Sequence, residues 1–340
     1  MKPAPPPVEE AEAGDPAAFA AIVAAARPVV LRGAVKHWPA VGAASPGGAA
    51  AAAYLARFDR GAAAEAFVAP PAAAGRFFYD GALTGFNFAR RPGAFAAIVA
   101  AIAGLEGRAD APSIYVGAAP VPEVVPGFER ENPLPLLAGL GAVPRIWIGT
   151  ASIVSTHFDE SDNLACVVAG RRRFTLFPPE QVANLYVGPL DFTMAGQPTS
   201  MVDLRAPDLE LYPRFARALA AARIAELEPG DALYVPALWW HNVEASSPFN
   251  ILVNHWWRAT PDDAGSPFLA LVHAILSVAA LPEAQRRGWR ANFDQFVFRD
   301  GDADPAAHLP EARRGILAAP TPALRRRIRQ FILAMLGRLA

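Results

Sequence analysis

The chain has little cysteine, little lysine and no long hydrophobic run, and each shortage excludes a class of protein. Cys166 is the only cysteine, so neither an internal disulfide framework nor an all-cysteine metal site is available. Lys2 and Lys36 are the only lysines among 31 basic residues, which excludes any mechanism that needs a lysine deep in the chain. The longest apolar run, Phe268 to Leu281, is too short to span a bilayer.

Charges of the two signs are nearly balanced, with 31 Lys+Arg against 32 Asp+Glu. No basic excess marks a nucleic-acid surface, so we expect neither nucleic acid nor a membrane as a partner. The first twelve residues are proline-rich and acidic and lack the apolar run of a signal peptide, which predicts a cytoplasmic protein. Hydrophobic residues make up 53% of the 340 residues, enough for a sizeable core.

The pattern along the chain predicts a mainly β protein with flanking helices. From about Ser113, short apolar runs bounded by proline or glycine follow one another, which is typical of an all-β sandwich or barrel. Strands are expected at 28–33, 113–116, 145–148, 153–158, 164–168, 172–177, 232–235, 241–245 and 250–257. Helices are expected at 15–26, 47–65, 92–104, 213–224, 266–280, 282–291, 310–318 and 322–338.

These elements suggest four regions. We expect residues 1–14 to form a flexible tail and residues 15–112 an N-terminal α/β layer that flanks the barrel. Residues 113–260 are predicted to form the barrel itself. Residues 261–340 are predicted to be a helical region, in which an apolar stripe from Leu324 to Leu339 serves either as a homodimer interface or as a face packed on the chain's own barrel.

The residues that carry chemistry are His157, Asp159 and His241. Residues two apart on a strand share a face, so His157 and Asp159 can reach one ion together. A second histidine from a neighbouring strand completes the two-histidine, one-carboxylate face of non-haem Fe(II) oxygenases, although the spacing does not distinguish Fe from Zn, Mn, Co or Ni. The alternative is that these histidines only cap, pair or fill space.

Two further polar residues lie on expected strands. Arg172 shares a face with Phe174 and Leu176, and a buried arginine requires an anion, for which a carboxylate is the natural partner. The pattern alone slightly favours the alternative that Arg172 is solvated or pairs with a surface carboxylate. Asn254 is either a satisfied core amide or a ligand contact. His255 lies on the opposite face from Asn254 and is expected to be structural.

Several stretches together resemble the JmjC-like cupin family, and within it the cupin-like group similar to the factor-inhibiting-HIF asparaginyl hydroxylase. The matching stretches are PSIYVG (112–117), RIWIG (145–149), HFDESDNLACVVAGRRRFTLFPPEQ (157–181), EPGDALYVPALWWHNVE (228–244) and NILVNHWW (250–257). The resemblance implies a double-stranded β-helix (cupin or jelly-roll) that binds Fe(II), 2-oxoglutarate and O2.

Carried over residue by residue, the resemblance assigns the metal ligands to His157, Asp159 and His241. It assigns cosubstrate contacts to Tyr115, Asn163, Arg172, Asn254 and Trp256. Two positions depart from the family pattern: Arg172 stands where these hydroxylases usually carry a lysine, and Val154 where a threonine helps to bind the same carboxylate. Ser155 or Thr156 substitutes for that threonine only with a one-residue shift, which reverses the facing of a strand.

The predicted function is an Fe(II)- and 2-oxoglutarate-dependent oxygenase that hydroxylates a protein, a peptide or a small molecule. Two alternatives stay open. One is a metal-binding cupin without 2-oxoglutarate chemistry, of an isomerase or hydrolase kind. The other is a non-catalytic regulatory module.

Overall fold

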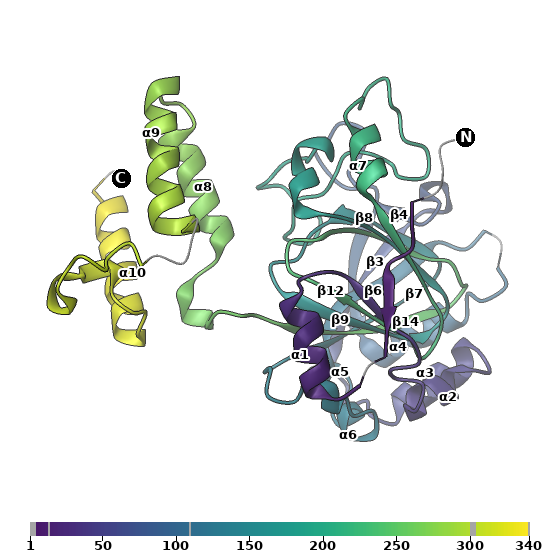
Figure 1. The fold of residues 1–340 in the computed structure, drawn as a ribbon. Helices are drawn as coiled ribbons and strands as arrows, with labels where there is room; N and C mark the ends of the chain where they lie inside the picture. Colours follow the sequence, from purple (N-terminus) through teal and green to yellow (C-terminus); the bar gives the residue numbers. More distant parts are fainter. Residues whose placement is uncertain (1–4, 13, 109, 300–303, 339–340) are drawn as a thin grey trace. The chain divides into compact units, whose positions relative to one another are not determined.

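A computed structural model describes residues 5–12, 14–108, 110–299 and 304–338. The chain divides into two compact units, Met1–Ala259 and Thr260–Ala340. Every strand that the structure describes belongs to the first unit, and the second unit is helical (Figure 1).

Two sheets form the first unit. The larger sheet has nine strands in the order β1-β2-β12-β9-β14-β7-β6-β3-β5, and the smaller has five in the order β11-β10-β13-β8-β4. The strands are β1 (Glu9–Ala11), β2 (Val29–Leu31), β3 (Ala63–Ala69), β4 (Arg76–Phe77), β5 (Ala89–Ala94), β6 (Ser113–Pro120), β7 (Val143–Gly149), β8 (Ser152–His157), β9 (Asp162–Ala169), β10 (Arg172–Phe177), β11 (Arg223–Leu227), β12 (Ala232–Val235), β13 (Trp240–Ala245) and β14 (Asn250–Trp257). Neighbouring strands are antiparallel except in the pairs β1–β2 and β4–β8.

The barrel interior lies between the two sheets, because alternate residues of each strand point inward. Phe174 and Leu176 of the smaller sheet pack in one buried cluster with Val167, Leu233 and Leu252 of the larger sheet. Two antiparallel sheets enclosing one apolar interior form a jelly roll. The predicted fold class, a double-stranded β-helix with flanking helices, is therefore confirmed.

Short helices cover the outer face of the larger sheet (Figure 1). They are α1 (Pro16–Ala24), α2 (Pro39–Ala44), α3 (Gly48–Ala56), α4 (Phe95–Ala103), α5 (Val121–Val124) and α6 (Phe128–Glu131). Asp15 caps α1 by accepting a hydrogen bond from the Ala18 amide at 2.9 Å, as the sequence predicts. Large aromatic side chains from this layer pack against the sheet and are almost fully buried there: Phe19, Trp38 and Phe128.

The outer face of the smaller sheet has its own cover. Helix α7 (Phe215–Ala221) packs on it through Phe215, against Phe177 and Trp240. In Figure 1, α7 lies on the side of the strands opposite to α1–α6. Helix α7 thus covers the part of the smaller sheet near Phe177 and Trp240, whereas Arg173 and Glu226 on the same outer face are exposed.

Two helices end or begin differently from the sequence prediction. The helix expected over 47–65 stops at Ala56, and residues 63–69 pair as β3. The helix expected over 92–104 begins at Phe95, because residues 89–94 form the edge strand β5. Alanine-rich propensity favoured helix in both cases, but pairing with neighbouring strands overrides it. Pro92 fits β5 because that strand lies at the sheet edge.

Two further predictions were wrong in detail. The helix expected over 213–224 ends at Ala221, and the strand β11, which the sequence analysis missed, follows it directly. Residues 310–318 hold only two single 3₁₀ turns, Glu311–Arg313 and Gly315–Leu317, instead of one helix.

The N-terminal segment is ordered where the structure describes it, contrary to the flexible tail expected over 1–14. Residues 9–11 form β1, which runs parallel to β2, and Val8 is buried in the barrel cluster. Glu10 also accepts from Arg32 at 2.6 Å. Apolar burial and this ion pair hold the segment at the sheet edge; residues 1–4 and 13 lie outside the described part of the chain.

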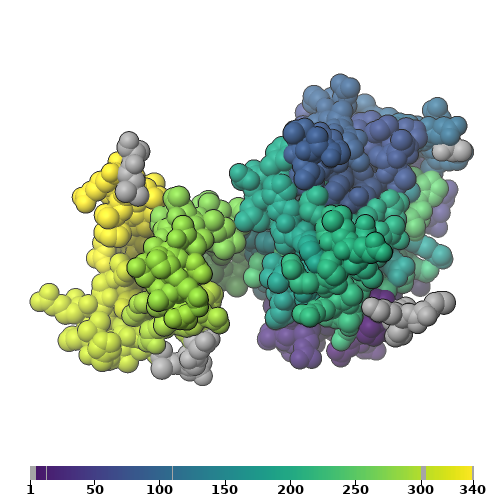
Figure 2. Space-filling view, turned by 90° about the horizontal axis from the view of Figure 1, so that it is seen from above, coloured from purple at the N-terminus to yellow at the C-terminus, as the bar shows by residue number. Residues whose placement is uncertain are grey.

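The C-terminal unit contains α8 (Pro267–Val278), α9 (Glu283–Phe293) and α10 (Pro322–Leu336), coloured green to yellow in Figures 1 and 2. Asp263 accepts from Arg325 at 2.7 Å and so ties the start of this unit to α10. Leu339, the last residue of the expected stripe, lies outside the described residues.

Candidate metal centre and cosubstrate cavity

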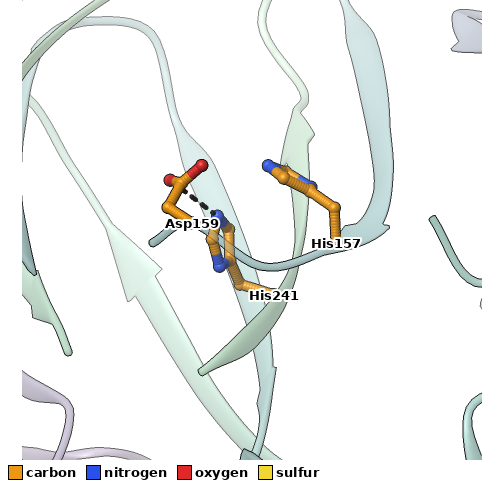
Figure 3. A group of neighbouring side chains, drawn as sticks. All are labelled: His157, Asp159 and His241. Atoms are coloured by element: carbon orange, nitrogen blue, oxygen red, sulfur yellow. Dashed lines mark ion pairs between the residues drawn. The ribbon is translucent and has the colours of Figure 1, made fainter. Parts of the chain in front are cut away.

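The two histidines and the aspartate come together where β8 and β13 pair. His157 ends β8 and lies opposite His241 in the register, and Asp159 follows β8 after one intervening residue. One ligand atom from each of the three residues lies within 4.8 Å of the others. Figure 3 shows the three side chains converging, with His241 Nε2 3.7 Å from Asp159 Oδ2. This spacing suits the ligands of one metal ion.

A β-bulge sets the direction of His157. Val243 pairs with Val154 and His241 with His157, so two residues of β8 oppose one residue of β13. The extra residue reverses the alternation, and Val154 and His157, three apart, line the same cavity. Val154 thus points into the cavity. Ser155 lines the cavity as well, and its hydroxyl is buried without a hydrogen-bond partner.

Backbone carbonyls orient both imidazoles. His157 Nδ1 lies 2.8 Å from the Ser155 carbonyl, and His241 Nδ1 lies 2.9 Å from the Trp239 carbonyl. A proton on each Nδ1 leaves Nε2 as the free lone pair, which is the form a metal ion requires. Burial lowers the pKa of His241 to about 4, so its ring is neutral at physiological pH.

A cavity of about 270 Å³ extends from His157 and Asp159 into the barrel. Two predicted cosubstrate residues, Tyr115 and Trp256, line it together with the apolar side chains of Phe77 and Trp147. The other lining residues are Ala118, Arg145, Val154, Ser155, Met194, Ala195, Gln197 and Thr199. His241, Asn163, Arg172 and Asn254 do not line it.

Arg172 is buried on the inner face of β10. Its neighbours on that face, Phe174 and Leu176, belong to the barrel interior, and Arg172 itself is 7% exposed. Its Nε has no hydrogen-bond partner, and none of the described carboxylates pairs with it. Arg173, which points outward, pairs instead with Glu226 at 3.4 Å. The solvated alternative for Arg172 is therefore wrong.

Burial lowers the pKa of Arg172 to about 10, yet the group stays a cation at neutral pH. A buried cation without a partner is costly, so this position suits a ligand that brings a carboxylate.

Asn163 and Asn254 form a buried amide pair next to the metal end of the barrel. Asn254 Nδ2 donates to Asn163 Oδ1 at 2.8 Å, whereas Asn254 Oδ1 has no partner. The indole Nε1 of Trp256, two residues further along β14, is buried without a partner as well. Unsatisfied buried polar atoms are rare in folded proteins. Five of those in the described residues belong to strands around the barrel interior, on Trp147, Ser155, Arg172, Asn254 and Trp256.

His255 points the other way along β14, as expected for a structural residue. It lies on the helix-covered face of the sheet, with its ring 6.1 Å from that of Trp38. It takes no part in the cavity.

The family assignment follows from a comparison of the whole sequence. A family model described as the cupin-like domain matches residues 16–263, most of the chain. The chain belongs to the cupin-like domain family. The resemblance to JmjC-like cupins is confirmed, because the relatives include JmjC domain proteins.

Curated relatives match a minor part of their own length. A tRNA wybutosine-synthesizing protein 5 of Danio rerio is 40% identical over 109 residues, 32% of this chain and 30% of the relative. A lysine-specific demethylase JMJ31 of Arabidopsis thaliana is 32% identical over 155 residues, 44% of this chain and 28% of the relative. A Jumonji C domain-containing protein 5 of Drosophila melanogaster is 37% identical over 120 residues, 35% of this chain and 28% of the relative. The matches thus span less than a third of each of these three relatives.

Sequence reasoning about this cupin-like domain missed a charged residue of the cavity. Arg145 lines the cavity from β7, on the same inward face as Trp147. Period-two alternation along 143–149 places both residues on one face and was the available signal. The segment 194–199 was also missed; it reaches the cavity because Thr199 forms a β-bridge with His157.

No helix of the described residues is both long and apolar enough to cross a membrane.

Proposed function

We propose that this cupin-like protein is an Fe(II)- and 2-oxoglutarate-dependent oxygenase that hydroxylates a protein, a peptide or a small molecule. One observation carries the proposal. A His-Asp-His metal group faces a cavity in a barrel whose interior also holds Arg172, a buried cation with no anion beside it. A cosubstrate that chelates a metal at one end and carries a carboxylate at the other matches both features.

The chain's own residues fit a divalent metal. His157 and His241 each offer a neutral Nε2, and Asp159 offers a carboxylate oxygen, so three ligands come from the protein. This set leaves coordination positions for a bidentate cosubstrate and for O2. When bound, iron in such a site supplies the activation of O2 that is coupled to oxidative decarboxylation of 2-oxoglutarate.

The inner barrel provides the remaining contacts. Arg172 offers a guanidinium that a carboxylate can meet in two parallel hydrogen bonds. Ser155 offers a buried hydroxyl with no other partner, and Tyr115 offers its phenol, whose pKa burial raises. The apolar walls of Phe77 and Trp147 exclude water, which strengthens each of these interactions.

The substrate itself is open within the proposed classes. Balanced charge argued against nucleic acid, but that exclusion has no support from the relatives, one of which is named for tRNA wybutosine synthesis. A substrate search therefore covers proteins, peptides, small molecules and tRNA. We also propose a cytoplasmic location and a homodimer formed through the C-terminal helices, whose exposed apolar side chains include Leu276 and Leu333.

The proposal is tested by turnover without a known substrate. Protein loaded anaerobically with Fe(II) and 2-oxoglutarate is exposed to O2, and succinate is followed over time. Wild type and Arg173→Ala should form succinate, while His157→Ala and Arg172→Ala should form at least about tenfold less. Arg173 is the matched control, because it is the neighbour of Arg172 on β10 but points outward.

Three other results have different meanings. Tight 2-oxoglutarate binding by wild type without succinate indicates turnover that requires the substrate. Metal binding with neither 2-oxoglutarate binding nor turnover contradicts the proposal and favours a metal cupin with other chemistry. A stable partner captured without turnover of any kind favours a regulatory module.

A further inference from the structure

Arg145 is a cation in the wall of the cavity. The proposed chemistry gives this residue no role in binding the metal or the cosubstrate. Its Nη1 donates to the Ala118 carbonyl at 2.9 Å, and its guanidinium lies 5.6 Å from the centre of the Trp256 ring. Among the described residues no carboxylate forms an ion pair with it. A guanidinium carries five N–H groups, so one hydrogen bond leaves most of its donors free.

The other charges of the cavity and of the barrel interior beside it have partners in the proposed complex. Asp159 is the one acidic residue in the cavity lining, and it serves as a metal ligand. Arg172 meets the distal carboxylate of the cosubstrate. Arg145 is then the charge that stays unbalanced next to the metal centre, in a wall where Phe77, Trp147 and Trp256 exclude water.

The strand register separates Arg145 from the cosubstrate end of the barrel. Arg145 pairs with Asn254, close to the metal end, whereas Gly149, four residues along β7, pairs with Asn250 and with Tyr115. Four residues of a strand span about 13 Å. Arg145 is also partly exposed, while Tyr115 is buried. Arg145 therefore lies toward solvent and Tyr115 lies deep.

We propose that Arg145 is a specificity-determining residue that binds a carboxylate of the primary substrate, so that the substrate is an acid. The carboxylate belongs either to a small organic acid or to the side chain of an acidic residue in a peptide. The claim that the substrate of the reaction is an acid rests on the proposed function. The claim that an anion binds beside Trp256 does not, because binding alone tests it.

The test compares acids with their amides. The protein is loaded with Mn(II) and N-oxalylglycine, an unreactive analogue of 2-oxoglutarate, so that the cosubstrate site is filled. The small probes are phenylacetate and phenylacetamide, and the peptide probes are Gly-Gly-Asp-Gly-Gly and Gly-Gly-Asn-Gly-Gly, each acetylated at its N-terminus and amidated at its C-terminus so that the side chain is the one difference in charge. Dissociation constants are measured by calorimetry and by tryptophan fluorescence, since the ring of Trp256 contacts Arg145.

In wild type, the acid of at least one pair should bind about tenfold more tightly than its amide, because a charge-assisted pair replaces a neutral one. Arg145→Gln should reduce the preference below about twofold, and Arg145→Lys should keep part of it. Arg173→Gln, outside the barrel, should behave as wild type. The pair that shows the preference distinguishes a small acid from a peptide. A thermal unfolding transition like that of wild type shows that each variant is folded.

Three outcomes overturn the inference. The first is no preference for acids, or no binding of either acid, by wild type. The second is that Arg145→Gln and Arg145→Lys both prefer the acid over its amide as strongly as wild type does. The third is that Arg145→Gln weakens N-oxalylglycine binding as much as Arg172→Ala does, which makes Arg145 a cosubstrate residue. If wild type binds no N-oxalylglycine, the proposed function fails, and the acid-to-amide comparison in the unloaded protein still decides the role of Arg145.

Discussion

Arg172 is the residue at which stability and function oppose each other. The residue is 7% exposed and its Nε has no partner, so the ligand-free protein bears the cost of burying a cation. An anion that binds there removes this cost and stabilises the folded state by linkage. A buried unpaired charge in a barrel interior is thus understandable as part of a binding site and not as part of the core.

The expected result of Arg172→Met is a more stable protein that no longer binds 2-oxoglutarate. Removing the unpaired charge should raise the free energy of unfolding by about 2 kcal/mol in urea titrations of the metal-free protein. In wild type, saturating 2-oxoglutarate with Mn(II) should raise Tm, and in the variant only Mn(II) should do so. A variant less stable than wild type would show that the guanidinium already has a stabilising partner.

His255 predicts a pH dependence of stability that is independent of the metal site. Burial lowers its pKa to about 4 from 6.5, so the unfolded chain binds a proton more readily than the folded protein. The stability contributed by the neutral ring is present above pH 6.5 and is lost as pH falls toward 4. The loss is about 3 kcal/mol for this group.

Urea unfolding of the metal-free protein between pH 7 and pH 4 measures this slope. His255→Phe should reduce the slope of stability against pH relative to wild type. His241, whose pKa is also lowered to about 4, accounts for much of the slope that remains in the variant. Cys166→Ala, a change in the same helix-covered core, should lower stability at every pH and leave the slope as it is. Equal slopes in wild type and His255→Phe would contradict the prediction.

At the scale of elements, the segment between β10 and α7 is held over the cavity by aromatic contacts. Phe192 stacks on Phe86 with ring centres 5.0 Å apart, and Tyr79 donates to the Phe192 carbonyl at 2.6 Å. Arg90 donates to the Met194 carbonyl at 2.7 Å. The aromatic residues between β4 and β5 therefore have a role that their composition did not reveal: they anchor one wall of the cavity.

Phe192→Ala should loosen this wall without unfolding the barrel. Loss of the stacked ring removes apolar contact area of the segment, so backbone amides of residues 190–199 should exchange with deuterium several-fold faster. Hydrogen exchange read by mass spectrometry measures this, with Leu211→Ala, an exposed residue of the same connection, as the control. Unchanged exchange in 190–199 would mean that hydrogen bonds alone hold the segment.

At the scale of the whole molecule, the C-terminal unit exposes more apolar surface than a monomer commonly leaves in water. In α8, Leu269 and Leu276 are 67% and 73% exposed, and in α10, Phe331 and Leu333 are 62% and 68% exposed. Apolar surface of this extent is typical of an interface. These exposed side chains support the proposed homodimer.

Sedimentation at micromolar concentration tests the dimer. Wild type should have twice the mass of the chain, and Leu276→Glu with Leu333→Glu should have the mass of one chain, because buried charge opposes association. Gln330→Glu adds one negative charge at an exposed polar position of α10 and should stay dimeric. A monomeric wild type would contradict the proposal.

Local patterns decided the parts of this protein that depend on nearby residues. Alternation along 145–148, 172–177 and 250–257 identified strands, and the Asp15 cap identified the start of α1, because facing and capping are properties of a few adjacent residues. The spacing of His157 and Asp159, with His241 on a later strand, indicated a metal site once the surrounding stretches showed the family resemblance.

Only the tertiary structure decided what depends on distant partners. Strand pairing turned alanine-rich residues 63–69 into β3, and a bulge opposite β13 turned Val154 toward the cavity. Whether Arg172 was solvated or buried depended on which sheet covered it, and Arg145 joined the cavity because β7 lies between β6 and β14. Pairing, register and enclosure arise from contacts between residues far apart in sequence, so the chain's local pattern determined the elements and the three-dimensional packing determined the site.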